Sequence, residues 1–107
     1  MMKKYKVTVT PDARQDLKNA VQYIKVKLHN PVAAKSLMDD YIVTRKRLSQ
    51  MAGSIRDADA DSICGRRNLK RINFARHNYF MLFLVDGDEA VVTNIFHDRE
   101  DYDHKLW

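Results

Sequence analysis

The segment at residues 79–85, which reads YFMLFLV, is almost continuously apolar. A strand with one face in water alternates apolar and polar residues, whereas a strand covered on both faces does not. The run therefore predicts a central strand whose side chains are buried on both faces of a sheet. A central strand of this kind constrains the fold more than any other feature of the sequence, because the rest of the chain must supply its neighbouring strands and the layers that cover its two faces.

Three further segments are expected to form strands. Residues 5–10 alternate apolar and polar side chains and include β-branched residues, which is typical of a half-buried strand. Residues 69–74 and 90–96 also have the composition of strands. The sequence DGDE at residues 86–89 predicts a tight hairpin turn before the last of them.

Two proline-containing segments predict where two helices begin. In TPD at residues 10–12, the threonine can cap a helix, the proline suits its first position, and the aspartate meets its positive end. The NP pair at residues 30–31 ends this helix near His29, because a residue before proline avoids the helical conformation. The same pair can cap and begin a second helix.

Apolar side chains recur at helical spacing after each of these starts. The first stripe consists of Ala13, Leu17, Ala20, Val21, Ile24 and Leu28. The second stripe consists of Ala34, Leu37, Met38, Tyr41, Leu48 and Met51. Because the connection between the helices is very short, we expect them to fold back as an antiparallel hairpin.

The predicted order of strand, helix, helix, strand, strand, strand is typical of an α+β fold. We expect an N-terminal strand, an antiparallel helical hairpin and a three-stranded antiparallel run, which together form a twisted, antiparallel, four-stranded sheet covered by two helices. The chain of 107 residues has the size of a single domain at 1–107. Residues 53–65 are expected to form a loop, whose three alternating aspartates indicate a solvated acidic segment rather than a calcium site: Asp57, Asp59 and Asp61.

Cysteine content and hydropathy restrict the compartment. The single cysteine, Cys64, excludes an intramolecular disulfide and indicates a reducing environment. The N-terminal lysines are not followed by the apolar stretch of a secretory signal, and no run approaches the length of a membrane span. The sequence therefore predicts a cytoplasmic protein that needs no membrane, metal or cofactor.

Positive charge dominates, with 19 Lys and Arg against 14 Asp and Glu and a formal net charge of +5. This favours a polyanionic partner, whether nucleic acid, ribosome or an acidic protein segment, without choosing among them. The densest cluster has no intervening acid, and it is either a surface that binds nucleic acid or another target, or a solvated face of the sheet: Arg66, Arg67, Lys70, Arg71 and Arg76. On a strand, Lys70 and Arg71 must point to opposite faces.

Two histidines lie at the ends of the strands. His77, just before the central strand, is either a general acid or base or part of the polar surface. His97, Arg99 and Tyr102 have the chemistry to cleave RNA through its 2′-hydroxyl, with Arg99 stabilising the phosphorane and His97 or Tyr102 moving protons. Three neighbouring acids raise the cost of binding a phosphate there and favour structural pairing with arginines: Asp98, Glu100 and Asp101.

Four segments, in order, resemble toxins of the RelE/ParE superfamily. Residues 5–24 resemble the first strand and helix, 30–37 (NPVAAKSL) the start of the second helix, 78–86 (NYFMLFLVD) the central strand, and 94–102 (NIFHDREDY) the last strand and tail. The resemblance covers almost the whole chain except residues 53–65. It implies a toxin of a bacterial type II toxin–antitoxin pair, bound in a hetero-oligomer by a cognate antitoxin whose acidic segment wraps the basic toxin.

The superfamily implies two activities: RelE-like members cut messenger RNA in the ribosome, and ParE-like members poison DNA gyrase. RelE-like enzymes usually carry an arginine where this chain has Phe80. The tail HDRED is closer to the ParE-like pattern H-x-R-R-D, although Glu100 replaces its second arginine. We therefore favour a gyrase poison. The alternatives are an inactive relative that only binds antitoxin and a metal-independent, ribosome-dependent endoribonuclease with these catalytic residues: Arg71, His77, His97, Arg99 and Tyr102.

Overall fold

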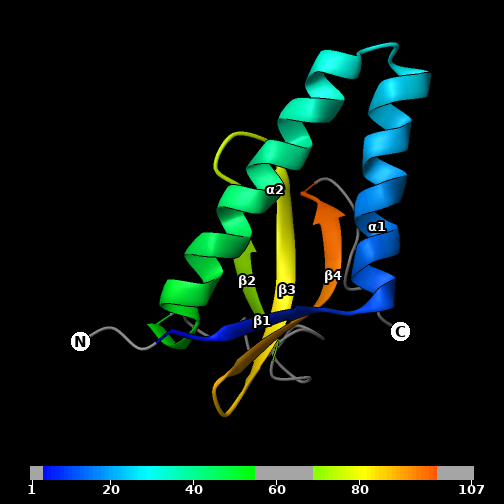
Figure 1. Ribbon diagram of the computed structural model, residues 1–107. Coiled ribbons are helices and arrows are strands. Elements are labelled where there is room, and N and C mark those ends of the chain that lie inside the picture. Colours follow the sequence, from blue (N-terminus) through cyan, green and yellow to red (C-terminus); the bar gives the residue numbers. More distant parts are fainter. Residues whose placement is uncertain (1–3, 55–68, 99–107) are drawn as a thin grey trace.

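The computed structural model describes residues 4–54 and 69–98, which form a helical hairpin on one face of a four-stranded sheet (Figure 1). The elements are, in order, β1 (Lys6–Val9), α1 (Pro11–Gln22), the π-helical turn η1 (Tyr23–Lys27), α2 (Pro31–Met51), the 3₁₀ turn η2 (Ala52–Ser54), β2 (Lys70–Asn73), β3 (Tyr79–Asp86) and β4 (Glu89–His97). The predicted α+β order is confirmed. Most of the predicted 53–65 loop, with its three aspartates and Cys64, lies outside the described residues.

The strand order is β1-β4-β3-β2, so β3 lies inside the sheet, antiparallel to both neighbours. The prediction of a wholly antiparallel sheet is wrong, because β1 runs parallel to β4. The helical hairpin explains the direction. Helix α1 leads away from the end of β1 and α2 returns to its start, where the Tyr5 N–H donates to the Ser49 carbonyl at 2.7 Å. Strand β2 therefore sets out in the direction of β1, and two further reversals give β4 that direction again.

Strand β3 buries side chains on both of its faces, as the sequence predicts. Met81 and Phe83 face the helices, whereas Phe80 and Leu82 pack with Phe96 on the opposite face. Each of these four β3 side chains has a relative exposure of 0%. Because burying a side chain of this size contributes about 1.5–3 kcal/mol, β3 is a large part of what stabilises the fold.

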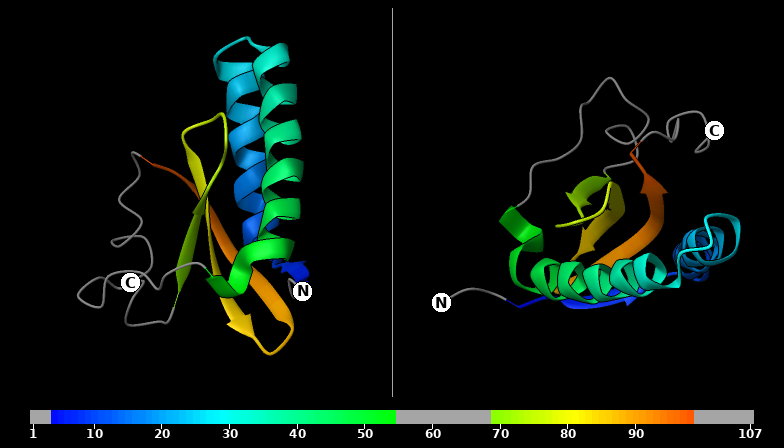
Figure 2. Two further views of the ribbon diagram at one scale, coloured as in Figure 1. Left: turned by 90° about the vertical axis from the view of Figure 1, so that its left-hand side faces the viewer. Right: turned by 90° about the horizontal axis from the view of Figure 1, so that it is seen from above.

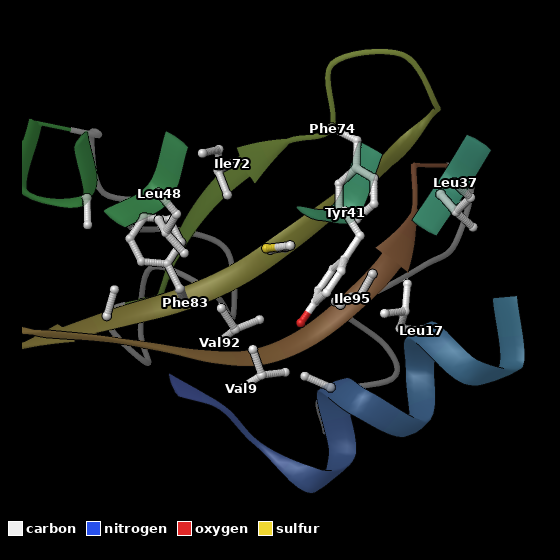
Figure 3. Packing of buried hydrophobic residues seen from close by; sticks show 14 of the residues in the cluster. Val9, Leu17, Leu37, Tyr41, Leu48, Ile72, Phe74, Phe83, Val92 and Ile95 are labelled. Carbon is white, nitrogen blue, oxygen red and sulfur yellow. The ribbon is translucent and has the colours of Figure 1, made fainter. Parts of the chain in front are cut away.

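The main core fills the space between the sheet and the hairpin, which covers one face only (Figure 2). Figure 3 shows side chains of α1, α2 and the strands meeting in this layer, among them Leu17, Leu37, Tyr41, Leu48 and Val92. Most side chains of the two predicted apolar stripes therefore point into a common core, against the face of β3 that carries Phe83. The last residue of each stripe is an exception, since Leu28 and Met51 are exposed.

Both helices begin as predicted. The Thr10 Oγ1 atom accepts a hydrogen bond from the Ala13 N–H at 3.2 Å, and the Asn30 Oδ1 atom accepts one from the Ala33 N–H at 3.0 Å. A proline occupies the first turn of each helix. Each cap satisfies a backbone N–H group that has no partner inside its own helix.

The first helix departs from the prediction at its end. After Gln22 the chain enters the π-helical turn η1, which the Leu28 N–H closes by donating to the Tyr23 carbonyl at 3.2 Å. A π-helical turn takes up more residues than an α-helical turn, so the side chains that follow rotate away from the apolar stripe. Ile24 stays buried, but Leu28, which the spacing places in the stripe, is 56% exposed.

Helix α1 is fastened to β4 beyond the point where β1 stops. Strand β1 pairs with β4 only as far as Val92, so the Ile95 N–H needs another acceptor. The Asp16 carboxylate provides it at 3.0 Å. Nearby, the Thr10 hydroxyl donates to the carbonyl of Thr93, the residue left over at a β-bulge, at 3.2 Å. These contacts hold the start of the hairpin on the sheet.

His29 ends the first half of the hairpin in the left-handed conformation, with φ of 51°. A side chain costs about 1–2 kcal/mol in that conformation, whereas glycine adopts it readily but loses more chain entropy. We expect His29→Gly to raise the free energy of unfolding by about 0.5–1 kcal/mol, as measured by urea denaturation. The control Lys27→Gly, inside η1, should lower it by a similar amount. A fall in stability for His29→Gly would mean that the imidazole ring makes a contact worth more than the strain.

Candidate functional site

A buried carboxylate on α2 holds the segment that joins β2 to β3. The Asp40 side chain is 3% exposed. Its Oδ1 atom accepts from the Ala75 N–H at 3.1 Å, and its Oδ2 atom accepts from the N–H groups of Arg76 and His77, both at 2.9 Å. Hydrogen bonds to an ionised acceptor are stronger than neutral ones, and here they compensate the carboxylate for the water it has lost. One side chain thus sets the position of the whole connection.

Sequence reasoning missed the role of Asp40, although a signal was present. Asp40 and Thr44 fall on the α2 face that carries Leu37, Tyr41 and Leu48, and both are buried. The Thr44 hydroxyl is satisfied by the Asp40 carbonyl at 2.7 Å. A charged residue inside an apolar stripe must find partners on another element, because an unpaired buried charge is very costly.

His77 is attached to α2 at a second point. Its Nε2 atom lies 3.0 Å from the Ser36 hydroxyl, in addition to the hydrogen bond from its backbone N–H to Asp40. The side chain is half-buried. The ring of this predicted acid or base is therefore engaged by a side chain of the same protein, and together with Asp40 it ties the β2–β3 connection to the helix.

His97 lies at the end of β4, opposite Tyr79 in the sheet. The two rings meet edge to face with centroids 5.0 Å apart, and the His97 Nδ1 atom is 3.5 Å from the Asp98 carboxylate. The Asp98 N–H donates to the Asn78 carbonyl at 2.9 Å. The structure therefore brings His77 and His97 to the same end of the sheet.

The described members of the basic cluster, Lys70, Arg71 and Arg76, do not share one face of the sheet. Lys70 pairs with Phe83 and so belongs to the face of the sheet that the helices cover, whereas Arg71 pairs with Leu82 on the opposite face. The prediction that these two side chains diverge is confirmed. Arg76 is exposed and lies beyond the end of β2, in the connection held by Asp40.

Arg71 is engaged by its own neighbours. Its guanidinium carbon lies 3.9 Å from the centroid of the Phe80 ring, and its Nε–H donates to the Asn73 side-chain oxygen at 2.8 Å. The arginine therefore stacks on the residue that distinguishes this chain from RelE-like enzymes. The remaining predicted site residues lie outside the described part of the chain: Arg66, Arg67, Arg99 and Tyr102.

A groove of about 360 Å³ lies between β1 and the C-terminal half of α2. Its lining combines an apolar floor with two cations and consists of Val7, Ile42, Arg45, Lys46 and Ser49. Strand β1 is also an edge strand of the sheet. A groove of this kind suits a peptide segment that carries both apolar and acidic side chains.

Among residues 4–54 and 69–98, no three His, Cys, Asp or Glu side chains group closely enough to hold a metal ion. In these described segments, no helix is both long enough and apolar enough to cross a membrane.

Residues 7–102 match the family model described as the ParE toxin of the type II toxin–antitoxin system parDE. The chain belongs to the ParE toxin family. It is thus a toxin component of a type II system, which confirms the resemblance seen in the sequence. A solved structure of the chromosomal ParDE system from P. aeruginosa matches this ParE-family toxin with a TM-score of 0.70 and 21% identity, over 88% of this chain and 96% of that chain. At that identity the likeness establishes the fold alone. No curated protein matches the sequence significantly.

The Asp40 contacts predict a measurable loss of stability in this ParE-family toxin. Asp40→Ala would leave three backbone N–H groups without the acceptor that joins them to α2, so we expect the free energy of unfolding to fall by about 2–4 kcal/mol in urea denaturation. The neighbouring Asp39 is exposed, and Asp39→Ala should change it by less than about 0.5 kcal/mol. Equal effects of the two substitutions would contradict the proposed importance of the Asp40 carboxylate.

Proposed function

We propose that this toxin arrests growth by binding DNA gyrase and trapping it on cleaved DNA. The observation that carries the proposal is the match of residues 7–102 to the ParE family, as opposed to the RelE-like branch of the superfamily. Phe80 supports the same branch, because a fully buried phenyl ring stands where RelE-like enzymes usually carry a phosphate-stabilising arginine.

The contacts at the candidate site support binding over RNA cleavage. A general acid or base must reach the proton that it transfers, and a phosphate-stabilising cation must reach the charge that develops. His77 instead contacts Ser36, Arg71 contacts Asn73 and Phe80, and His97 packs against Tyr79. These three residues are better understood as parts that join β2, β3, β4 and α2. The test of this proposal must therefore distinguish a gyrase poison from an endoribonuclease.

The second proposed partner is the cognate antitoxin, in a hetero-oligomer within the cytoplasm. An acidic segment of the antitoxin, with apolar anchors, would lie in the groove between β1 and α2. Its carboxylates would meet Arg45 and Lys46, and its apolar side chains would cover Val7 and Ile42. Binding there would neutralise part of the net charge of +5.

The proposed target predicts which synthesis stops first. When the toxin is induced without antitoxin, DNA synthesis should stop before protein synthesis, because gyrase trapped on cleaved DNA blocks replication; pulse labelling of both in one culture measures the order. Purified toxin and gyrase should also convert supercoiled plasmid to cleaved plasmid. If protein synthesis stops first and the plasmid stays intact, the chain is a ribosome-dependent nuclease. If growth does not slow at all, it is an antitoxin-binding relative without activity.

The groove predicts a charge-sensitive contact with the antitoxin. Arg45→Glu should weaken antitoxin binding by about tenfold or more, since it replaces an attraction with a repulsion, and calorimetric titration would measure the change. Arg14→Glu makes the same change at an exposed site on α1 and should leave the affinity nearly unaltered. Equal weakening by both would show that only net charge matters and that the antitoxin segment does not lie in the groove.

A further inference from the structure

Exposed apolar side chains gather where the helical hairpin turns. We call this surface the hairpin tip and define it by Tyr23, Val26, Leu28 and Val32, whose relative exposures are 54%, 53%, 56% and 79%. The first two belong to η1, Leu28 follows it, and Val32 lies in the first turn of α2. All four lie between residues 23 and 32, and apolar side chains grouped on the surface of a small domain mark an interaction site more often than isolated exposed residues do.

The tip lies away from the body of the protein. Figures 1 and 2 both show the turn between α1 and α2 projecting beyond the ends of the strands. Within η1 only Ile24 is buried in the main core. The fold therefore does not depend on the apolar character of the four side chains at the hairpin tip. If water were their only neighbour, polar side chains at the same positions would be more favourable.

Backbone hydrogen bonds close the turn at the tip. The Leu28 N–H donates to the Tyr23 carbonyl at 3.2 Å and the Asn30 N–H donates to the Ile24 carbonyl at 3.1 Å, while His29 occupies the left-handed region. The Asn30 side chain then caps α2. A π-helical turn and a left-handed non-glycine residue are both features that concentrate at functional sites. A surface organised in this way loses little freedom when it binds.

The positive charge around the hairpin tip restricts the kind of partner that can bind there. Residues 17–38 contain four lysines and no acid, and all four are exposed: Lys18, Lys25, Lys27 and Lys35. Two such tips would repel each other, which disfavours a second copy of this chain. A nucleic acid backbone would meet the lysines but would leave Val26 and Leu28 without apolar contact. An apolar pocket with a rim of carboxylates satisfies both features.

We propose that the hairpin tip is the surface with which the toxin docks onto its target protein, in an apolar pocket rimmed by acidic side chains. The proposal rests on the proposed function only in requiring that the target be a protein. The tip and the antitoxin groove lie at opposite ends of α2, since Val32 and Arg45 are about 20 Å apart along the helix axis. The two partners therefore use different surfaces of the toxin.

Two valines of similar exposure allow a matched test, because Val26 is 53% exposed at the tip and Val43 is 49% exposed on α2 away from it. Val26→Asp should weaken target binding by about tenfold or more and relieve the growth arrest caused by toxin without antitoxin. Val43→Asp should leave the arrest intact. Both variants should melt at the temperature of the wild type, and Val26→Asp should bind the antitoxin with unchanged affinity.

A charge variant keeps the test valid if Val26→Asp does not fold. The exposed pair Lys25→Glu with Lys27→Glu should relieve the arrest, whereas Lys4→Glu with Lys6→Glu, the same change on exposed lysines at β1, should not. The proposal is overturned if folded tip variants still arrest growth, if relief comes with lost antitoxin binding, or if the wild type causes no arrest. Plasmid cleavage by purified gyrase is scored separately. If the plasmid stays intact but the tip variants still relieve the growth arrest, gyrase is rejected as the target, and the hairpin tip is retained as the docking surface for another protein.

Discussion

Four successive side chains of β3, residues 80–83, are buried, which requires a strand that has a neighbour on each edge and is covered on each face. Two of these side chains join the layer beneath the helical hairpin, and the other two join a smaller cluster on the far face. The helices must therefore lie across the sheet, and β2 and β4 must flank β3. The directions of the remaining strands follow from the way in which the hairpin returns the chain.

Helix α2 links this frame to every surface that we assign to function. Its inner face supplies Leu37, Tyr41 and Leu48 to the core, and Asp40 on the same face holds the connection between β2 and β3. The groove proposed for the antitoxin lies beside its C-terminal half, and the hairpin tip lies at its N-terminal end. A single rigid helix therefore sets the distance between two proposed binding surfaces.

The basic residues near the sheet fit this view of the molecule as a binding protein. Arg71 stacks on Phe80, His77 contacts Ser36, and His97 packs against Tyr79. Each of these residues has the chemistry of a ribonuclease site when considered alone. In the folded chain each contributes a contact between secondary-structure elements. Exposed cations on η1 and α2, among them Lys25, Lys27 and Arg45, are accessible to partners.

The sequence by itself determined the local structure: the two capped helix starts, the strand at 79–85, the hairpin turn after it and the divergence of Lys70 from Arg71. Such features depend on residues within a few positions of one another, so their pattern can be read directly. Tertiary structure alone decided the parallel pairing of β1 with β4, the exposure of Leu28 and the partners of Asp40 and His77. The hydrogen bond between Asp40 and the His77 N–H spans 37 positions, for example. Contacts of that separation exist only after the hairpin has packed on the sheet, because no local preference of either segment specifies which distant backbone groups will meet.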